Sequence, residues 1–316
     1  MDAPATAPVA LNMKEWGDFS QNPSLKISRR KLINPGSKIF TMGSCFAMEI
    51  RRAMARRGFD VFPRYTDVQF DPTQQIFDMI PKREMTPHYD TFVIRQEFEA
   101  ALGVWTDREA GFWEVHNAPV NQFVQKETVY QDPSRKLNYA KSLPALKDLA
   151  DKVDAVIRQG IVESDLIVIT LGLTEVWRHN KTGRYLCRPP NTGYGGGDGL
   201  ATFRQSTFVE NYLNVKATLD LLFSKFPQKN VVLTVSPVPL ALTYSATDIG
   251  TANMESKSIL RAVAGQICRE YAARVTYFPS YEMATIMPWP VFQEDKRHVL
   301  PEFADRVVTT FHDMFS

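Results

Sequence analysis

Two short stretches of the sequence contain side chains that together could perform nucleophilic catalysis. Ser44 stands in KIFTMGSCFAMEIRRAMARRG, residues 38–58, where an apolar run gives way to a basic amphipathic one. In FQEDKRHVLPEF, Asp295 and His298 are three residues apart, so on a turn the carboxylate can reach one imidazole nitrogen. The other nitrogen is then free to act as a general base. A serine supplied with such a pair performs acyl transfer.

Ser44 and Cys45 each have an alternative interpretation. Serine is a favoured N-cap, so Ser44 could do no more than cap the helix that begins after it. A thiol at a helix N-terminus can be the better nucleophile, which makes Cys45 a second candidate. Packed beneath the helix, Cys45 would instead be a small apolar side chain. In either case its backbone N–H can donate to an oxyanion.

Other polar residues stand at or just after apolar runs further along the chain. Glu175 and Trp177 follow the run at 165–172 and are candidates to line a pocket, although a tryptophan in such a place is more often part of the core. Ser236 stands near the end of the next apolar run, at 230–237. Lys257, at the start of a predicted helix, could reach an anionic group of a substrate or simply be solvated.

The elements that must position these residues alternate between strands and helices. Continuous apolar runs predict strands, and apolar residues on one helical face predict helices. The expected strands are residues 38–42, 59–67, 165–172, 230–237 and 274–280, and the expected helices are 46–57, 143–160, 206–226, 256–274 and 300–315. This alternation predicts an α/β fold with a parallel sheet covered by helices on both faces. Ligands bind beyond the carboxyl ends of such strands, where the polar residues gather.

The remaining segments divide the chain. Residues 1–36, rich in proline and alanine at first, are expected to form an arm laid over a single α/β domain at 37–316. Residues 68–143 show little periodicity and are expected to be an insertion after the first strand–helix unit. The alternating stretch TFVIRQEFEA (91–100) is one of the small elements expected within it.

Composition narrows the class of protein. The 316 residues include 44% hydrophobic and 23% charged residues, and the formal net charge is +2, which gives no electrostatic reason to expect nucleic acid as a partner. No apolar stretch is long enough to span a membrane and no secretory signal is visible. The three cysteines are scattered, so a reducing cytoplasm is the expected location.

No metal or cofactor is expected. None of the five histidines has the spacing of metal ligands. The glycine-rich stretch NTGYGGGDGLATF (191–203) does not complete G-x-G-x-x-G and follows Pro-Pro rather than a strand, which argues against a dinucleotide site. This stretch could form a flap over the site or a solvated loop, and the sequence does not decide between the two.

The stretch GSCFA (43–47) resembles the signature of the GSCFA family, a branch similar to the SGNH hydrolases. The likeness continues in TLGLTEVW (170–177), TVSPVPL (234–240), ESKSILRAV (255–263) and FPSYE (278–282), and ends in the Asp–His pair. It implies a three-layer α/β/α domain of flavodoxin-like strand order. It also implies Ser44 as nucleophile, His298 as general base and Asp295 as its orienter, acting on an acyl ester that in the SGNH group is often carried by a carbohydrate.

The sequence departs from the broader SGNH pattern at two points. Gly43 precedes the serine where that pattern commonly has Asp. The Gly-x-Asn block is replaced by Gly172-Leu173-Thr174, so the usual Asn donor to the oxyanion is missing. The expected oxyanion hole is therefore made by Cys45, Gly172 and Thr174, the last through its hydroxyl or its backbone N–H.

The sequence thus predicts a serine-dependent hydrolase of O-acyl groups, O-acetyl by preference, on a carbohydrate or small molecule. An O-acyltransferase would use the same serine chemistry with a different acceptor. A non-catalytic glycan-binding domain is the alternative from another class, because a fold does not fix a function.

Overall fold

Five strands form a parallel sheet at the centre of the protein. The computed structural model describes residues 18, 19, 21, 25, 29–77, 88–115, 128–135, 138–187, 189–190 and 199–316. The strands are β1 (Lys38–Gly43), β2 (Asp60–Phe62), β7 (Leu166–Leu171), β11 (Asn230–Val235) and β12 (Val275–Tyr277). Every pairing within this sheet is parallel, as predicted from the alternation of strands and helices.

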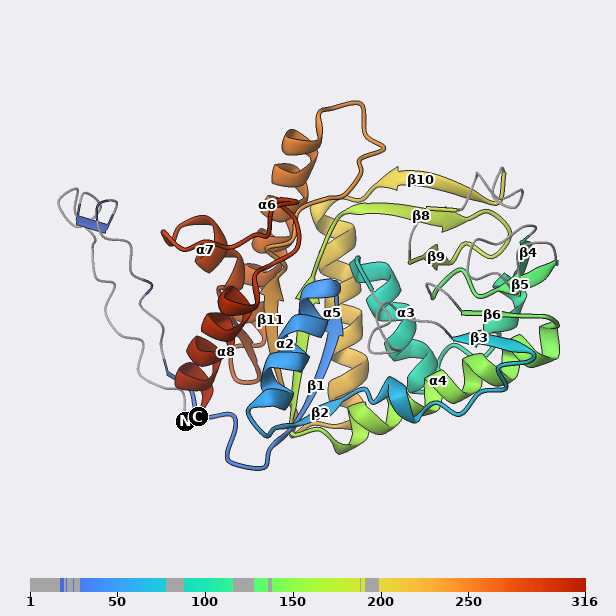
Figure 1. Cartoon of the computed structure of the whole chain (residues 1–316), viewed down its shortest axis with the longest axis horizontal. Helices are drawn as coiled ribbons and strands as arrows, with labels where there is room; N and C mark the ends of the chain where they lie inside the picture. The colour runs from blue at the N-terminus through green and yellow to red at the C-terminus, as the bar shows by residue number, and fades with distance from the viewer. Residues whose placement is uncertain are drawn as a thin grey trace.

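The strand order places the site. The strands lie in the order β12-β11-β7-β1-β2 (Figure 1). Taken in chain order this is the flavodoxin-like arrangement 2-1-3-4-5, which confirms the predicted fold class. The connections leave β1 and β7 in opposite directions, and Gly43 is in register with Thr170. Ser44 and Gly172 therefore follow neighbouring strands at the point where such folds bind ligands.

Helices cover both faces of this sheet because its strand residues alternate between two cores. Phe40 and Ile167 belong to one core with α3 (Thr91–Ala101), α4 (Leu143–Glu163), α5 (Phe208–Lys225) and α6 (Ile249–Glu270). Ile39 and Val168 belong to the other, with α2 (Cys45–Arg56), α7 (Ser280–Thr285) and α8 (Pro301–Phe315). The apolar face of α2 is closed by α8.

Helix α4 runs beyond the predicted end at Gly160. A Cβ at Gly160 would lie 2.8 Å from Phe40 Cδ2 and 2.8 Å from Phe62 Cβ. This glycine therefore lets the helix approach the sheet closely, and it does not end the helix. The helix continues to Glu163.

The predicted insertion contains a second, antiparallel sheet. It consists of β3 (Gln75–Phe77), β4 (Trp113–Val115), β5 (Val129–Gln131) and β6 (Asn138–Ala140), in the order β3-β6-β5-β4. The alternating stretch at 91–100, expected to be one of the small elements of the insertion, is a helix, α3. Asp90 caps this helix by accepting hydrogen bonds from the backbone of Phe92 and Val93, and Ile94 and Phe98 then face the core.

A third sheet, absent from the sequence prediction, follows β7. It contains β8 (Glu175–His179), β9 (Tyr185–Leu186) and β10 (Ala201–Gln205), all antiparallel. Residues 191–198 of the glycine-rich stretch lie outside the described residues, so neither the flap nor the loop interpretation is tested there. The end of that stretch enters β10.

The described part of the N-terminal segment packs against the end of α8. The backbone N–H groups of Arg30 and Leu32 donate to the carbonyl oxygens of Met314 and Phe315 at 2.8 and 2.7 Å. Figure 1 shows this segment beside α8. Most of the predicted arm lies outside the described residues.

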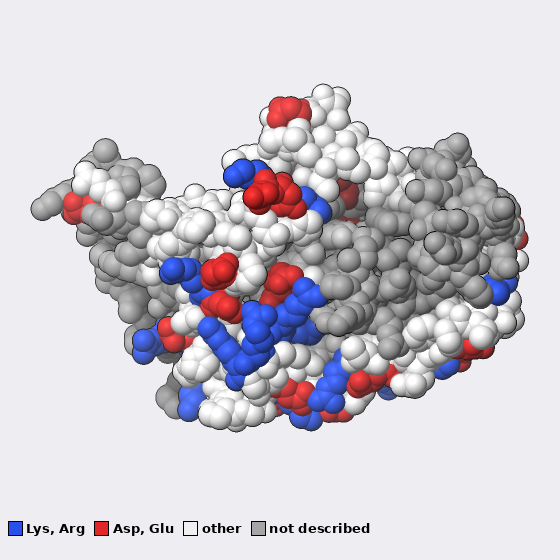
Figure 2. All heavy atoms as spheres, in the orientation of Figure 1, with Lys and Arg blue, Asp and Glu red and all other residues white. Residues whose placement is uncertain are grey.

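Two of the three arginines of α2, Arg52 and Arg56, reach the surface, whereas Arg51 is buried. Figure 2 shows Lys and Arg side chains gathered on the face over α2, with acidic side chains around them. Arg52 pairs with Glu49 at 3.0 Å and Arg56 with Asp305 at 2.7 Å. Pairs at or near the surface contribute little to stability. Arg52 and Arg56 thus fit a solvated face of this helix, and Arg51 does not.

Candidate active site

Ser44 stands on a turn that only glycine permits before it. Gly43 has φ +137°, and a Cβ there would lie 2.1 Å from the carbonyl oxygen of Thr170. An Asp in place of Gly43, as in the broader SGNH pattern, would not fit. The Ser44 N–H donates to Thr170 Oγ1 at 3.0 Å, which fixes the start of α2 against β7.

The Ser44 hydroxyl caps α2 and also lines a pocket. Its Oγ accepts a hydrogen bond from the Phe46 N–H at 3.2 Å, so the N-cap interpretation is confirmed. Only 3% of the residue is exposed, yet Ser44 lines a cavity of about 360 Å³. The cap therefore does not exclude a chemical role, because it orients the oxygen at the edge of the cavity.

The neighbouring thiol is a poor nucleophile in this setting. Burial raises the pKa of Cys45, and the charges of Arg297 and Lys257 oppose that shift without reversing it. The residue packs against the apolar core beneath α2. A thiol kept protonated is unreactive compared with a thiolate. Ser44 is thus favoured over Cys45.

Asp295 and His298 form the contact that their spacing predicts. Asp295 Oδ1 accepts hydrogen bonds from the backbone N–H groups of Arg297 at 3.0 Å and His298 at 2.9 Å, and its Oδ2 contacts His298 Nδ1. The Arg297 N–H, followed by the His298 side chain, lowers the pKa of Asp295 to about 2. With Nδ1 held by a carboxylate, Nε2 is left to exchange a proton.

The structure does not join His298 to Ser44 directly. No hydrogen bond between them occurs among the described residues, and 60% of the His298 side chain is exposed. Arg297, which lies between Asp295 and His298 in the sequence, does line the pocket. The pair therefore lies on the loop that borders the pocket, while the Ser44–His298 contact stays a prediction.

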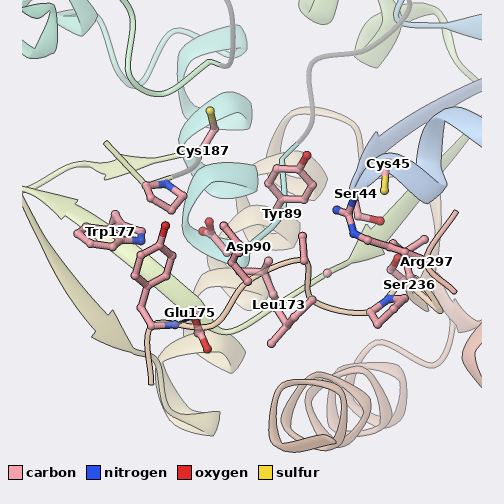
Figure 3. Close-up of a pocket in the computed structure, with 18 of the residues that line it drawn as sticks. Ser44, Cys45, Tyr89, Asp90, Leu173, Glu175, Trp177, Cys187, Ser236 and Arg297 are labelled. Carbon is pink, nitrogen blue, oxygen red and sulfur yellow. Dashed lines mark hydrogen bonds between the residues drawn. The ribbon is translucent and has the colours of Figure 1, made fainter. Parts of the chain in front are cut away.

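The pocket collects most of the residues proposed from the sequence. Those that line it are Ser44, Cys45, Gly172, Glu175, Trp177, Ser236 and Lys257. Tyr89, Asp90, Arg297 and the segment 238–242 also line it, and the sequence analysis missed them. Figure 3 shows Ser44, Cys45, Ser236 and Arg297 at one end of the pocket and Trp177, Glu175 and Cys187 at the other.

Two of the three expected oxyanion donors are already engaged. The Gly172 N–H donates to the Tyr89 carbonyl at 3.1 Å. Thr174 is fully buried, its N–H donates to Ser256 Oγ at 2.9 Å, and its hydroxyl lies 2.7 Å from the same atom. The expected roles of Gly172 and Thr174 are therefore corrected, because both groups serve the packing of the loop after β7.

The third expected donor, Cys45, and one group absent from the sequence prediction, Arg297, remain at the Ser44 end of the pocket. The Cys45 N–H, in the first turn of α2, has no acceptor on any other described residue. The Arg297 Nε is buried and likewise unpartnered within the described part of the chain. Figure 3 shows the Arg297 side chain directed toward Ser44 and Cys45. Negative charge developing beside Ser44 would meet both groups.

Lys257 and Glu175 hold the pocket wall together. Lys257 is 1% exposed, so the solvated interpretation is wrong, and its Nζ donates to the carbonyls of Gly172 at 2.7 Å and Val238 at 2.9 Å. The carboxylate of Glu175 accepts hydrogen bonds from the Thr243 hydroxyl and the Tyr244 N–H. Both charged side chains therefore tie the loops after β7 and β11 to one another.

Lys257 should make stability depend on pH. Burial lowers the pKa of Lys257 to about 7 from the ordinary 10.5. Between these values the unfolded chain holds a proton that the folded chain has released, so the free energy of unfolding should rise with pH across that window. Urea denaturation at several pH values measures the free energy of unfolding of the wild type and of Lys257→Met. The difference between these two free energies should change with pH.

The control for that experiment is Lys225→Met, which removes an exposed lysine at the end of α5. The free energy of unfolding of this variant should change with pH in the same way as that of the wild type. A difference between wild type and Lys257→Met that stays constant from pH 6.5 to 10 would contradict the prediction.

The described residues contain no group of three or more His, Cys, Asp or Glu placed to hold a metal ion. Within the same part of the chain, no helix is both long and apolar enough to cross a membrane.

Comparisons with known proteins give the family. No curated protein sequence matches this chain. One solved structure, described as "Peptidoglycan O-acetylesterase in action, 5 min", aligns with 11% identity over 95% of this chain and 93% of that chain, with a TM-score of 0.37. The model of the GSCFA family matches residues 38–311, most of the chain. The resemblance seen in the sequence is therefore confirmed, and the protein belongs to the GSCFA family.

Proposed function

We propose that this protein is a serine-dependent hydrolase of O-acyl esters that forms an acyl-enzyme at Ser44. The observation that carries the proposal is the position of Ser44 at the rim of a cavity, on the turn between β1 and α2, with the Asp295–His298 pair on the bordering loop. The resemblance to the SGNH hydrolases favours a carbohydrate as the alcohol part of the ester.

The reaction would follow the general course of serine acyl transfer. Ser44 Oγ attacks the ester carbonyl while its proton passes to His298 Nε2, and Asp295 stabilises the resulting imidazolium. The alcohol leaves with that proton, and water then attacks the acyl-enzyme by the same route. Catalytic hydrogen bonds often tighten only when substrate is bound, so this course requires the exposed His298 side chain to approach Ser44.

The oxyanion of each tetrahedral intermediate needs donors that are free before the reaction begins. The Cys45 N–H and the Arg297 guanidinium meet that condition at the Ser44 end of the pocket. We assign them the role that an Asn side chain has in the broader SGNH pattern. A cation at this position would also neutralise charge in a site with little water.

An acyltransferase is a second candidate that one observation favours. The cavity beside Ser44 is lined mainly by apolar side chains, including Leu173, Val238 and Leu240. Such a lining limits the access of water to the acyl-enzyme. A transferase needs water to be kept out so that its acyl group passes to another alcohol. Partition of the acyl group between water and an added sugar alcohol distinguishes the two activities.

The proposed function is tested by incubating the protein with a small aryl ester and, separately, with a serine-reactive fluorophosphonate, followed by mass spectrometry. Turnover and an adduct on Ser44 are expected. If neither turnover nor an adduct is seen, the non-catalytic glycan-binding alternative gains support.

Replacing Arg297 tests the oxyanion assignment. Arg297→Met should lower kcat by roughly 10²- to 10³-fold, the loss typical of removing one oxyanion donor, while KM changes less. The measurement is steady-state hydrolysis of an aryl ester. Lys296→Met, which removes the exposed positive charge of the adjacent residue, is the matched control. Equal effects of the two substitutions would show that only the general charge of the loop matters.

A further inference from the structure

The pocket has two ends of different character. Ser44 and Arg297 supply a hydroxyl and a positive charge at one end (Figure 3). Away from them the wall is made of aliphatic and aromatic side chains, among them Leu173, Leu186 and Leu240. Trp177 closes the far end, with its ring edge-on to Tyr244 at 5.0 Å between centroids. An ester with its carbonyl at Ser44 could therefore extend one substituent along an apolar wall.

Polar side chains in this wall are largely occupied. Glu175 uses its carboxylate on Thr243 and Tyr244, and Lys257 donates to two backbone carbonyls. Asp90 Oδ1 accepts the two N–H groups at the start of α3. A sugar placed here would leave several hydroxyls without partners, and burying a polar group without a hydrogen bond is unfavourable. A hydrocarbon chain has no such requirement.

The cavity is also larger than an acetyl group needs. Its volume is about 360 Å³, within the range of roughly 300–1,000 Å³ that encloses drug-sized ligands. An acetyl group at Ser44 would leave the wall from Leu173 to Trp177 empty. Filling it with methylene groups removes apolar surface from water and binds the substrate more tightly.

We propose that this pocket holds the acyl part of the substrate, and that the acyl group is an apolar chain of medium length, between butyryl and octanoyl, rather than acetyl. The inference rests on the proposed function, because it takes Ser44 as the atom that attacks the ester. It places the alcohol part on the side of Ser44 and Arg297, away from Trp177. It differs from the acetyl preference predicted from the sequence.

The test is the chain-length profile of hydrolysis. Rates are measured with p-nitrophenyl acetate, butyrate, hexanoate and octanoate, with Ser44→Ala as the blank for each ester. Each buried methylene contributes up to about fourfold in kcat/KM, so we expect the octanoate to exceed the acetate by at least about tenfold. A matched pair of variants locates the effect. Leu173→Trp narrows the pocket and should reduce the octanoate-to-acetate ratio several-fold. Leu213→Trp, at an exposed leucine of α5 outside the pocket, should keep the wild-type ratio.

The possible results separate this inference from the proposed function. Serine-dependent turnover that is fastest with acetate and falls with chain length would overturn the acyl-pocket assignment and leave the hydrolase intact. Absence of turnover with every ester, together with no fluorophosphonate adduct, would overturn both. If Leu173→Trp fails to fold, as judged by its circular dichroism spectrum, the wild-type profile decides alone.

Discussion

Replacing Ser44 with alanine is expected to abolish the acyl-enzyme and to lower kcat for an aryl ester by roughly 10⁴- to 10⁶-fold. The physical reason is that, among the described residues lining this end of the pocket, Ser44 alone combines a reactive hydroxyl with a helix N-terminus. The adjacent Cys45 has its pKa raised by burial and stays protonated. Mass spectrometry after fluorophosphonate treatment should find the label on Ser44 in the wild type and on no residue of the variant.

Ser44→Ala also removes a helix cap, which by itself costs about 1 kcal/mol of stability. Ser142→Ala is the matched control, because Ser142 caps α4 by accepting a hydrogen bond from the Ala145 N–H. It should lose similar stability and keep full activity. Cys45→Ser should likewise remain active, with losses traceable to packing. A label on Cys45, or full activity in Ser44→Ala, would reject Ser44 as the nucleophile.

Asp295→Asn is expected to lower kcat by about 10⁴-fold, the loss seen when a triad carboxylate becomes an amide. The amide keeps the shape of the side chain but removes the charge that stabilises the imidazolium of His298. It can also present an N–H where His298 Nδ1 needs an acceptor, which favours the wrong tautomer. The measurement is single-turnover and steady-state hydrolysis of the same aryl ester, alongside a thermal melt.

The control for this substitution is Glu294→Gln, which removes the charge of the exposed residue next to Asp295. It should leave kcat within about twofold of wild type, as expected for a surface charge screened by water. Because the pKa of Asp295 is lowered to about 2 from the ordinary 3.8, its charge in the folded protein persists down to about pH 2. The stability that this charge contributes is lost progressively as the pH falls from 3.8 through 2. Near-normal turnover in Asp295→Asn would indicate that another carboxylate, first of all Glu294, orients His298.

The sheet and the place of Ser44 at its edge could be predicted from the sequence because both depend on local signals. Apolar runs identify β1, β7 and β11, and the alternation with helices gives their parallel direction. The position of Ser44 follows from the strand and helix on either side of it. The contact of Asp295 with His298 is set by three residues of spacing.

The rest of the site depends on contacts between distant segments, which no local pattern reports. Gly172 was expected to donate to an oxyanion, but its N–H is used by Tyr89, a residue of the insertion. Thr174 is similarly held by Ser256 on α6. The sequence pattern does not predict the helix at Thr91–Ala101, because the residues that follow its capping residue, Asp90, alternate between polar and apolar.

The packing of α2 against α8 has a consequence for synthesis of the chain on the ribosome. Ser44 and the apolar face of α2 emerge about 250 residues before His298 and the helix that closes that face. At roughly 5–20 residues per second, the nascent chain spends ten seconds or more with this face uncovered. Exposed apolar surface of this kind recruits chaperones or other nascent chains. Premature termination before α8 should therefore give an aggregating, inactive fragment rather than a weak enzyme.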